Sequence, residues 1–222
     1  MQLSFGVGKI PISIHVSFFI MTLLLGSSMP TSDLRIWMLW IPIVLASVLV
    51  HELGHALMGK AFGLTPRIEL HGMGGTTSWE HKDVSAPKKI LISLAGPLTG
   101  IILGMALKLG VAYGRIELPP MADVAVSMIV TVNVGWGILN LLPILPLDGG
   151  NVMAQAFAIA TGGRGQRAAH IVSIVIAVAG GGFALLSGSW WPAMLAAMFA
   201  YQNFRALVPE QRQPPANPPA RW

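Results

Sequence analysis

The chain lacks cysteine altogether and contains few charged residues. Without cysteine in 222 residues, disulfides, thiolate metal ligands and a cysteine nucleophile are all excluded. Asp, Glu, Lys and Arg make up only 10% of the residues, whereas soluble domains carry about 25%. Hydrophobic residues reach 54%, and the mean hydropathy is +0.67. This composition is typical of an integral membrane protein, whose surroundings are the lipid bilayer.

A net charge of +5 could indicate a nucleic-acid partner. The basic residues, however, are scattered between apolar runs, which is typical of the loops of a membrane protein. We therefore expect no nucleic-acid partner.

Stretches without charged residues predict the membrane spans, because about 20 apolar residues cross a bilayer. The last such stretch is too long for one span, and we place a turn at Ser187–Pro192, where paired tryptophans suit a membrane interface. We expect an all-α polytopic fold with about six transmembrane helices in residues 10–32, 36–59 (Glu52 alone being charged), 90–107, 124–147 and, as two helices, 168–204.

The distribution of Lys and Arg predicts the orientation. With six spans, eleven of these residues lie on the side of the two termini and three lie on the other side, namely Arg35, Lys108 and Arg115. Cytoplasmic loops carry the excess of positive charge. The sequence therefore predicts a multi-pass protein of the cell membrane with both termini in the cytoplasm.

Two end segments have their own interpretations. The first apolar run could be a signal peptide, but it is longer than the usual apolar region, and its removal would leave an odd number of spans. Residues 208–222 contain five prolines, which predicts a disordered cytoplasmic tail. We expect residues 1–207 to form one membrane domain.

His51-Glu52-Leu53-Gly54-His55 follows the H-E-x-x-H pattern within the second predicted span. A helix puts residues four apart on one face, so both imidazoles can bind one Zn²⁺. Glu52 can then reach a water without being a ligand. Chance histidines satisfied by neighbouring helices are the alternative, but ionisable groups are costly in an apolar span and point to function.

A catalytic zinc site needs a third protein ligand. Asp148 is the best candidate, because Asn140–Gly150 reads NLLPILPLDGG and its prolines break the fourth span at the depth of the histidines. An unwound segment at that depth is tolerated where it lines a watered cavity. A helix-end carboxylate facing the cytosol is the simpler alternative for Asp148. The other candidates have simpler roles. His15 suits a snorkelling or capping role, and solvated or interfacial roles suffice for His71, His81 and His170. Glu69, Asp83 and Asp123 are loop carboxylates.

The segment 66–79, PRIELHGMGGTTSW, places β-branched and aromatic residues around a Gly-rich turn. It suits a small β-hairpin after the second span, with an ordinary interfacial loop as the alternative. Gly96, Gly100 and Gly104 form a stripe of small residues that predicts a close helix contact, and Asn133 suits an interhelical hydrogen bond.

H-E-L-G-H followed about ninety residues later by N-x-x-P-x-x-P-L-D-G-G resembles the site-2 protease family of intramembrane zinc metalloproteases. GGTTSW and SLAGP extend the resemblance over roughly residues 8–205. The short chain is similar to a minimal member without a PDZ or CBS domain. Gly100, where asparagine often follows A-G-P, and Asn151, where a basic residue often follows D-G-G, depart from the pattern.

The resemblance implies a function and roles for seven residues. His51, His55 and Asp148 would bind one zinc ion per chain, and Glu52 would activate water. Asn140, Gly74 and Gly75 would engage substrate, the glycines on a membrane-associated hairpin. The expected substrate is a transmembrane protein cut within or near its membrane segment, in regulated intramembrane proteolysis. A regulatory membrane partner or a second copy of the chain would be further partners.

Three other classes remain alternatives. Intramembrane His and Asp also mark metal-ion transporters, although a transporter has no need of Glu52 in this register. A prenyl-protein endopeptidase is disfavoured by the N-x-x-P-x-x-P-L-D-G-G segment. An inactive homologue that serves as a scaffold is disfavoured by the intact set of four site residues.

Overall fold

A computed structural model describes residues 2–27, 33–79 and 84–208. The expected tail of residues 208–222 therefore lies almost wholly outside the described residues. Eleven elements follow one another along these described residues. They are β1 (Gln2–Val7), β2 (Ile10–His15), α1 (Val16–Gly26), α2 (Leu34–Ala61), β3 (Pro66–His71), β4 (Gly74–Trp79), α3 (Ala86–Tyr113), α4 (Pro120–Asn140), α5 (Asp148–Ala160), α6 (Gln166–Leu186) and α7 (Trp190–Leu207).

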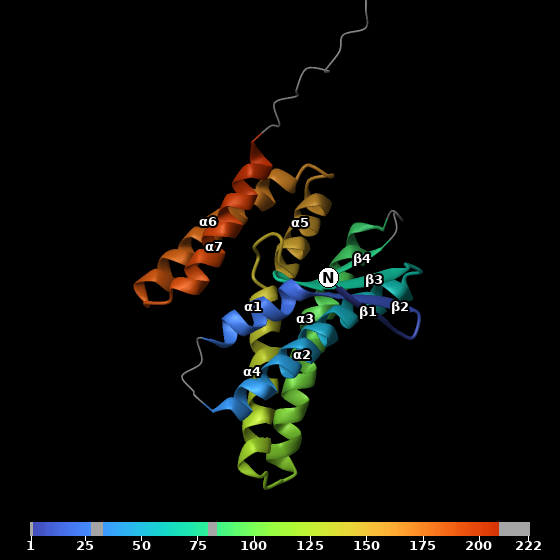
Figure 1. Ribbon diagram of the computed structural model, residues 1–222. Coiled ribbons are helices and arrows are strands. Elements are labelled where there is room, and N and C mark those ends of the chain that lie inside the picture. Colours follow the sequence, from blue (N-terminus) through green and yellow to red (C-terminus); the bar gives the residue numbers. More distant parts are fainter. Residues whose placement is uncertain (1, 28–32, 80–83, 209–222) are drawn as a thin grey trace, which may run out of the picture.

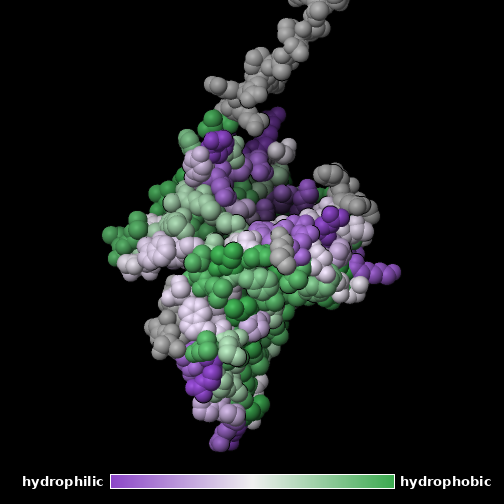
Figure 2. All heavy atoms as spheres, viewed as in Figure 1, coloured by the Kyte–Doolittle hydropathy of each residue, from purple (hydrophilic) through white to green (hydrophobic). Residues whose placement is uncertain are grey.

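Four helices in the described part of the chain, α2, α3, α4 and α6, are long and apolar enough to cross a membrane. Their exposed surface carries large apolar side chains such as Ile102 and Phe183, and apolar surface dominates the helical part of Figure 2. The helical, membrane-type fold is thus as expected. The turn expected at Ser187–Pro192 is confirmed, because α6 ends at Leu186 and α7 begins at Trp190.

The count of six spans is not confirmed, and the first charge-free run is divided differently. Residues Ile10–His15 form strand β2, and α1 has only 11 residues. At 1.5 Å per residue α1 is about 16 Å long, roughly half the hydrocarbon thickness of a bilayer. The absence of charge alone does not distinguish a buried strand from a helix, which is why the sequence interpretation merged them.

The expected hairpin of residues 66–79 is present as β3 and β4, and it belongs to a larger sheet. The strand order is β1-β2-β3-β4, with β2 and β3 parallel and the two hairpins antiparallel. The sheet lies across one end of α2, α3 and α4, while α6 and α7 form a pair that stands apart from these helices, with α5 as a neighbour (Figure 1).

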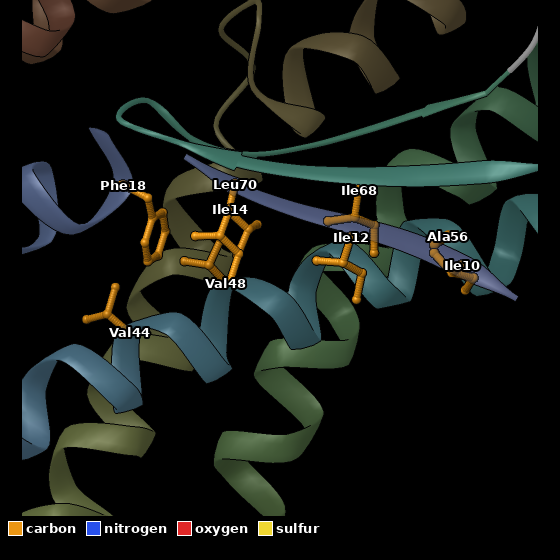
Figure 3. Packing of buried hydrophobic residues seen from close by; sticks show 9 residues of the cluster. All are labelled: Ile10, Ile12, Ile14, Phe18, Val44, Val48, Ala56, Ile68 and Leu70. Atoms are coloured by element: carbon orange, nitrogen blue, oxygen red, sulfur yellow. The ribbon is translucent and has the colours of Figure 1, made fainter. Parts of the chain in front are cut away.

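The sheet packs on α2 through alternate residues of its two central strands. Their buried side chains interdigitate with those of α2 and Phe18 (Figure 3). The period of two follows from strand geometry, which turns every second side chain to the same face. The cluster consists of Ile10, Ile12, Ile14, Phe18, Val44, Val48, Ala56, Ile68 and Leu70. This core holds the β3–β4 hairpin against the part of α2 that carries the H-E-x-x-H pattern.

The glycine stripe of α3 makes the predicted close helix contacts. A Cβ at Gly100 would lie 3.3 Å from the carbonyl oxygen of Asn133 on α4, and one at Gly104 would lie 3.0 Å from Val134 Cγ2. Asn133 also makes the predicted interhelical hydrogen bond, donating from Nδ2 to Ser47 Oγ on α2 at 2.8 Å. These contacts hold α2, α3 and α4 together around the site.

Candidate metal centre

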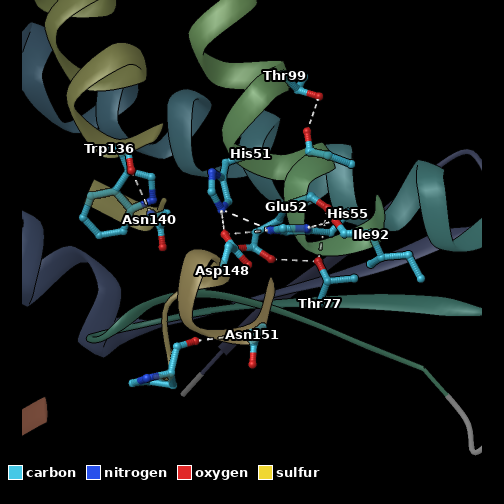
Figure 4. Close-up of polar contacts among 12 residues, drawn as sticks. His51, Glu52, His55, Thr77, Ile92, Thr99, Trp136, Asn140, Asp148 and Asn151 are labelled. Carbon is cyan, nitrogen blue, oxygen red and sulfur yellow. Dashed lines mark hydrogen bonds and ion pairs between the residues drawn. The ribbon is translucent and has the colours of Figure 1, made fainter. Parts of the chain in front are cut away.

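The described residues contain one group that could hold a metal ion: His51, His55 and Asp148. Asp148 Oδ2 lies 3.1 Å from His51 Nε2 and 3.3 Å from His55 Nε2, and the two Nε2 atoms are 3.2 Å apart. The three donor atoms therefore converge on one point (Figure 4). The fold has brought Asp148 to histidines almost a hundred residues away along the chain.

These distances fit zinc. Bond lengths of about 2.0–2.2 Å in a tetrahedral site place ligand atoms roughly 3.3–3.6 Å apart, close to the three observed separations. His55 Nδ1 lies 2.7 Å from the carbonyl oxygen of Ile92, so this nitrogen carries the ring proton and Nε2 presents its lone pair. His55 Nε2 and Asp148 Oδ2 lie 3.3 Å apart, so one cation placed between them could bind both atoms. The bond to Ile92 is the kind of second contact that orients a metal-binding histidine.

His55 and the neighbouring helix α3 are closely fitted to each other. A Cβ on Gly96 would overlap the imidazole ring of His55. A residue without a side chain is therefore required at position 96, and the first glycine of the α3 stripe serves the site as well as helix packing. This role could not be read from the spacing of the glycines alone.

Asp148 is positioned by the break between α4 and α5. Helix α4 ends at Asn140, as the prolines of this segment predict, and α5 begins at Asp148 itself. Gly149 and Gly150 lie in the first turn of α5. A Cβ on Gly149 would overlap the carbonyl group of Leu141, so the glycines let the new helix start directly against the segment that precedes it.

Glu52 is 4% exposed, and its side chain lies between strand β4 and the metal-binding group (Figure 4). Its Oε2 accepts a hydrogen bond from Thr77 Oγ1 at 2.7 Å. A Cβ on Gly75 would lie 2.5 Å from Glu52 Cγ and Oε1, so Gly75 gives the carboxylate room beside the strand. A carboxylate held beside a metal-binding group, but not part of it, can serve as a general base.

The remaining predicted site residues lie around this group. Asn140, at the end of α4, donates from Nδ2 to the carbonyl oxygen of Trp136 at 2.9 Å (Figure 4). Gly74 has φ +117°, and its Cβ position is 3.1 Å from the Trp136 ring. Thr77 and Gly96 are contacts that the sequence analysis missed. A hydroxyl residue in the predicted hairpin was the available signal for Thr77.

The other histidines that the structure describes do not join the metal-binding group. His71 Nε2 is 2.9 Å from Thr76 Oγ1, and His170 Nδ1 is 2.8 Å from Asn203 Oδ1. His15 occupies the N-cap position of α1, where its side chain makes no capping hydrogen bond. His81 and Asp83 lie outside the described residues.

The chain was compared with known proteins. The family model for peptidase family M50 matches residues 120–183. A putative zinc metalloprotease of Synechocystis sp. is 31% identical over 172 residues, which cover 72% of this chain and 44% of that protein. A zinc metalloprotease of Methanocaldococcus jannaschii is 27% identical over 154 residues, 67% of this chain and 43% of that protein. The chain thus spans less than half the length of these two relatives.

A solved structure extends the comparison to the whole fold. The site-2 protease of Methanocaldococcus jannaschii superimposes with a TM-score of 0.62, covering 96% of this chain and 99% of that chain at 22% sequence identity. At this identity the match establishes a shared fold. The curated relatives, which are named zinc metalloproteases, indicate Zn²⁺ as the metal for the group His51, His55 and Asp148.

Proposed function

Since these matches all support the site-2 protease family, we propose that this chain is an intramembrane zinc metalloprotease. Its substrate is a membrane protein, cut at a peptide bond within or near a transmembrane segment in regulated intramembrane proteolysis. The observation that carries the proposal is the convergence of His51, His55 and Asp148, with donor atoms 3.1–3.3 Å apart, beside the separate carboxylate of Glu52.

The four residues divide the chemistry between them. His51, His55 and Asp148 hold one zinc ion, which supplies Lewis acidity to the scissile carbonyl. Glu52 takes the proton of the attacking water and passes it to the leaving amine. Thr77 holds one carboxylate oxygen of Glu52 at 2.7 Å, which fixes the direction from which the proton is taken.

Strand β4 supplies a way of presenting the substrate. It is an edge strand with β3 as its neighbour, and Thr77 in its middle contacts Glu52. A transmembrane helix hides its carbonyls in internal hydrogen bonds, so it must be extended before it is cut. We propose that the extended segment adds to the free edge of β4, with Gly74 and Gly75 leaving room for its backbone and Asn140 binding it from the end of α4.

The same proposal covers the placement in the membrane. Residues 1–207 form the protease domain of a multi-pass protein of the cell membrane, with six spans and both termini in the cytoplasm. The excess of Lys and Arg beside the termini supports this orientation. The metal centre then lies towards the cytoplasmic end of α2, where water reaches it. A regulatory membrane partner or a second copy of the chain would gate this entrance.

The proposal is tested with purified protein in vesicles that contain a panel of single-span proteins, comparing native chain with Glu52→Gln. The amide keeps the size of the carboxylate but cannot accept the proton, so cleavage should fall by roughly 10²–10⁴-fold while zinc content and fold are kept. Mass spectrometry of the fragments should place the cut within or near the membrane segment. The proposal is wrong if Glu52→Gln cleaves at the native rate, or if the native chain moves zinc across the vesicle and cuts nothing.

A further inference from the structure

The backbone of Leu145, three residues before Asp148, is held at both of its polar groups by side chains of α6 and α7. Its N–H donates to Ser173 Oγ on α6 at 2.9 Å. Its carbonyl oxygen accepts from Asn203 Nδ2 on α7 at 2.6 Å. Leu145 belongs to the irregular segment between α4 and α5, where backbone groups have no helical partner. Side chains of two helices from the C-terminal part of the chain thus hold this segment by hydrogen bonds.

The side chains of Ser173 and Asn203 are both buried, and each makes a further hydrogen bond that fixes its orientation. Ser173 is 0% and Asn203 is 2% exposed. The Ser173 hydroxyl donates to the carbonyl oxygen of Ala169 at 2.8 Å. Asn203 Nδ2 also donates a hydrogen bond to the carbonyl oxygen of Phe199 at 2.8 Å. Because Nδ2 faces two carbonyl oxygens, the orientation of the Asn203 amide is determined. His170 contacts its Oδ1 at 2.8 Å and completes the network.

The hydrogen bonds act on a short and tightly folded segment. Ile144 packs against Ala177 of α6 and Phe199 of α7, next to the two bonds at Leu145. The N–H of Leu147 donates back to the carbonyl oxygen of Ile144 at 2.8 Å, and the next residue is Asp148. The two residues between Leu145 and Asp148 therefore leave little freedom, and a displacement of Leu145 moves the Asp148 carboxylate as well.

Resting on the proposed function, we propose that Ser173 and Asn203 are positioning residues for the metal centre. Through Leu145 they set the carboxylate of Asp148 relative to His51 and His55, which belong to the separate helix α2. The α6–α7 pair stands apart from α2 and α3 in Figure 1, and it reaches the centre by way of this segment and α5. A movement of α6–α7 relative to α2 consequently alters the geometry of the three ligands.

The test is the binding of Co²⁺, whose visible absorption bands report ligand geometry and require no substrate. Native protein, Ser173→Ala and Asn203→Leu are stripped of metal and titrated with Co²⁺ in detergent. We expect weaker binding in both variants, up to the roughly 10- to 100-fold that losing a direct partner of a metal ligand costs, together with shifted absorption bands. Ser173→Thr keeps the hydroxyl and should restore most of the native behaviour.

Two control variants separate positioning from a general loss of stability. Ala184→Gly loosens the opposite end of α6, where Ala184 is buried, and Gln202→Leu alters an exposed neighbour of Asn203. Both should keep the native Co²⁺ affinity and spectrum, even where the melting temperature falls. If Asn203→Leu does not fold, Ser173→Ala, which removes a single oxygen atom, decides the question.

Native affinity and spectrum in folded Ser173→Ala would overturn the positioning role and leave the proposed protease function standing. Equal loss of Co²⁺ binding in Ala184→Gly would also overturn it, because instability alone would then explain the effect. A native protein that binds no Co²⁺ at all would overturn the proposed function, and this inference with it.

Discussion

Thr77 donates its hydroxyl hydrogen to the Glu52 carboxylate, with 2.7 Å between Thr77 Oγ1 and Glu52 Oε2. The two residues come from different kinds of element, because Thr77 lies on the edge strand β4 and Glu52 on helix α2. The bond therefore joins the strand proposed to receive the substrate to the group proposed to take the proton. Displacement of β4 along its edge would displace the general base as well.

Thr77→Val removes this bond while keeping the shape of the side chain. A hydrogen bond to a charged group contributes about 1.5–3 kcal/mol, and about 1.4 kcal/mol of barrier corresponds to tenfold in rate. We expect kcat to fall about tenfold or more, with zinc content unchanged. Thr76→Val is the matched control, since Thr76 contacts His71 and should leave kcat unaltered. A native kcat in Thr77→Val would show that the bond has no role in the reaction.

Gly75→Ala introduces a methyl group 2.5 Å from Glu52 Cγ and Oε1. The carboxylate must then move, and misplacement of a reacting group by 1 Å can cost about 10²-fold. Cleavage should fall by roughly 10- to 100-fold, whereas metal analysis should find native zinc content. Gly6→Ala in strand β1 is the control, because its Cβ would come no closer than 3.7 Å to another group. Equal activity of the two variants would contradict the steric argument.

His55→Ala and Asp148→Ala should each lose most of the bound zinc, because each removes one of three ligands to a single ion. Metal analysis of purified protein should find about one zinc per native chain. Asp123→Ala removes a carboxylate in the first turn of α4, outside the metal-binding group, and should keep the native content. Undiminished zinc in Asp148→Ala would exclude Asp148 as a ligand.

A reporter fused after Trp222 should be active in the cytoplasm, because eleven Lys and Arg residues lie beside the termini and three on the other side. A second reporter inserted after Gly114, between α3 and α4, should report the opposite side. Activity of the first reporter only outside the cytoplasm would overturn the orientation. The same result would contradict the proposed entry of water from the cytoplasmic side, because that proposal depends on the orientation.

Local geometry was readable from the sequence. His51 and His55 share a face because residues four apart always do so in a helix. The end of α4 at Asn140 follows from proline, which cannot continue a helix, and the β3–β4 hairpin follows from β-branched residues around glycines. Each of these features depends on residues a few positions apart, whose covalent geometry leaves few choices.

The strand β2 shows a local signal that the sequence interpretation did not use. Ile10, Ile12 and Ile14 alternate with Pro11 and Ser13, a period of two that is typical of a half-buried strand. The charge-free run from residue 10 to residue 32 outweighed that alternation and suggested a single helix. Its pairing with β3 depends on a partner more than fifty residues away.

The sequence by itself determined that the chain has long apolar helices, that two histidines can bind one metal ion, and that Glu52 lies beside them. Only the tertiary structure decided that Asp148 reaches those histidines, that Thr77 and Gly75 adjoin Glu52, and that Asn203 and Ser173 hold Leu145. The physical reason is that helix geometry acts over a single turn, whereas an apolar helix face can pack against many others. Which faces meet depends on shape across the whole molecule, such as the absence of a side chain at Gly96 that lets His55 and α3 approach.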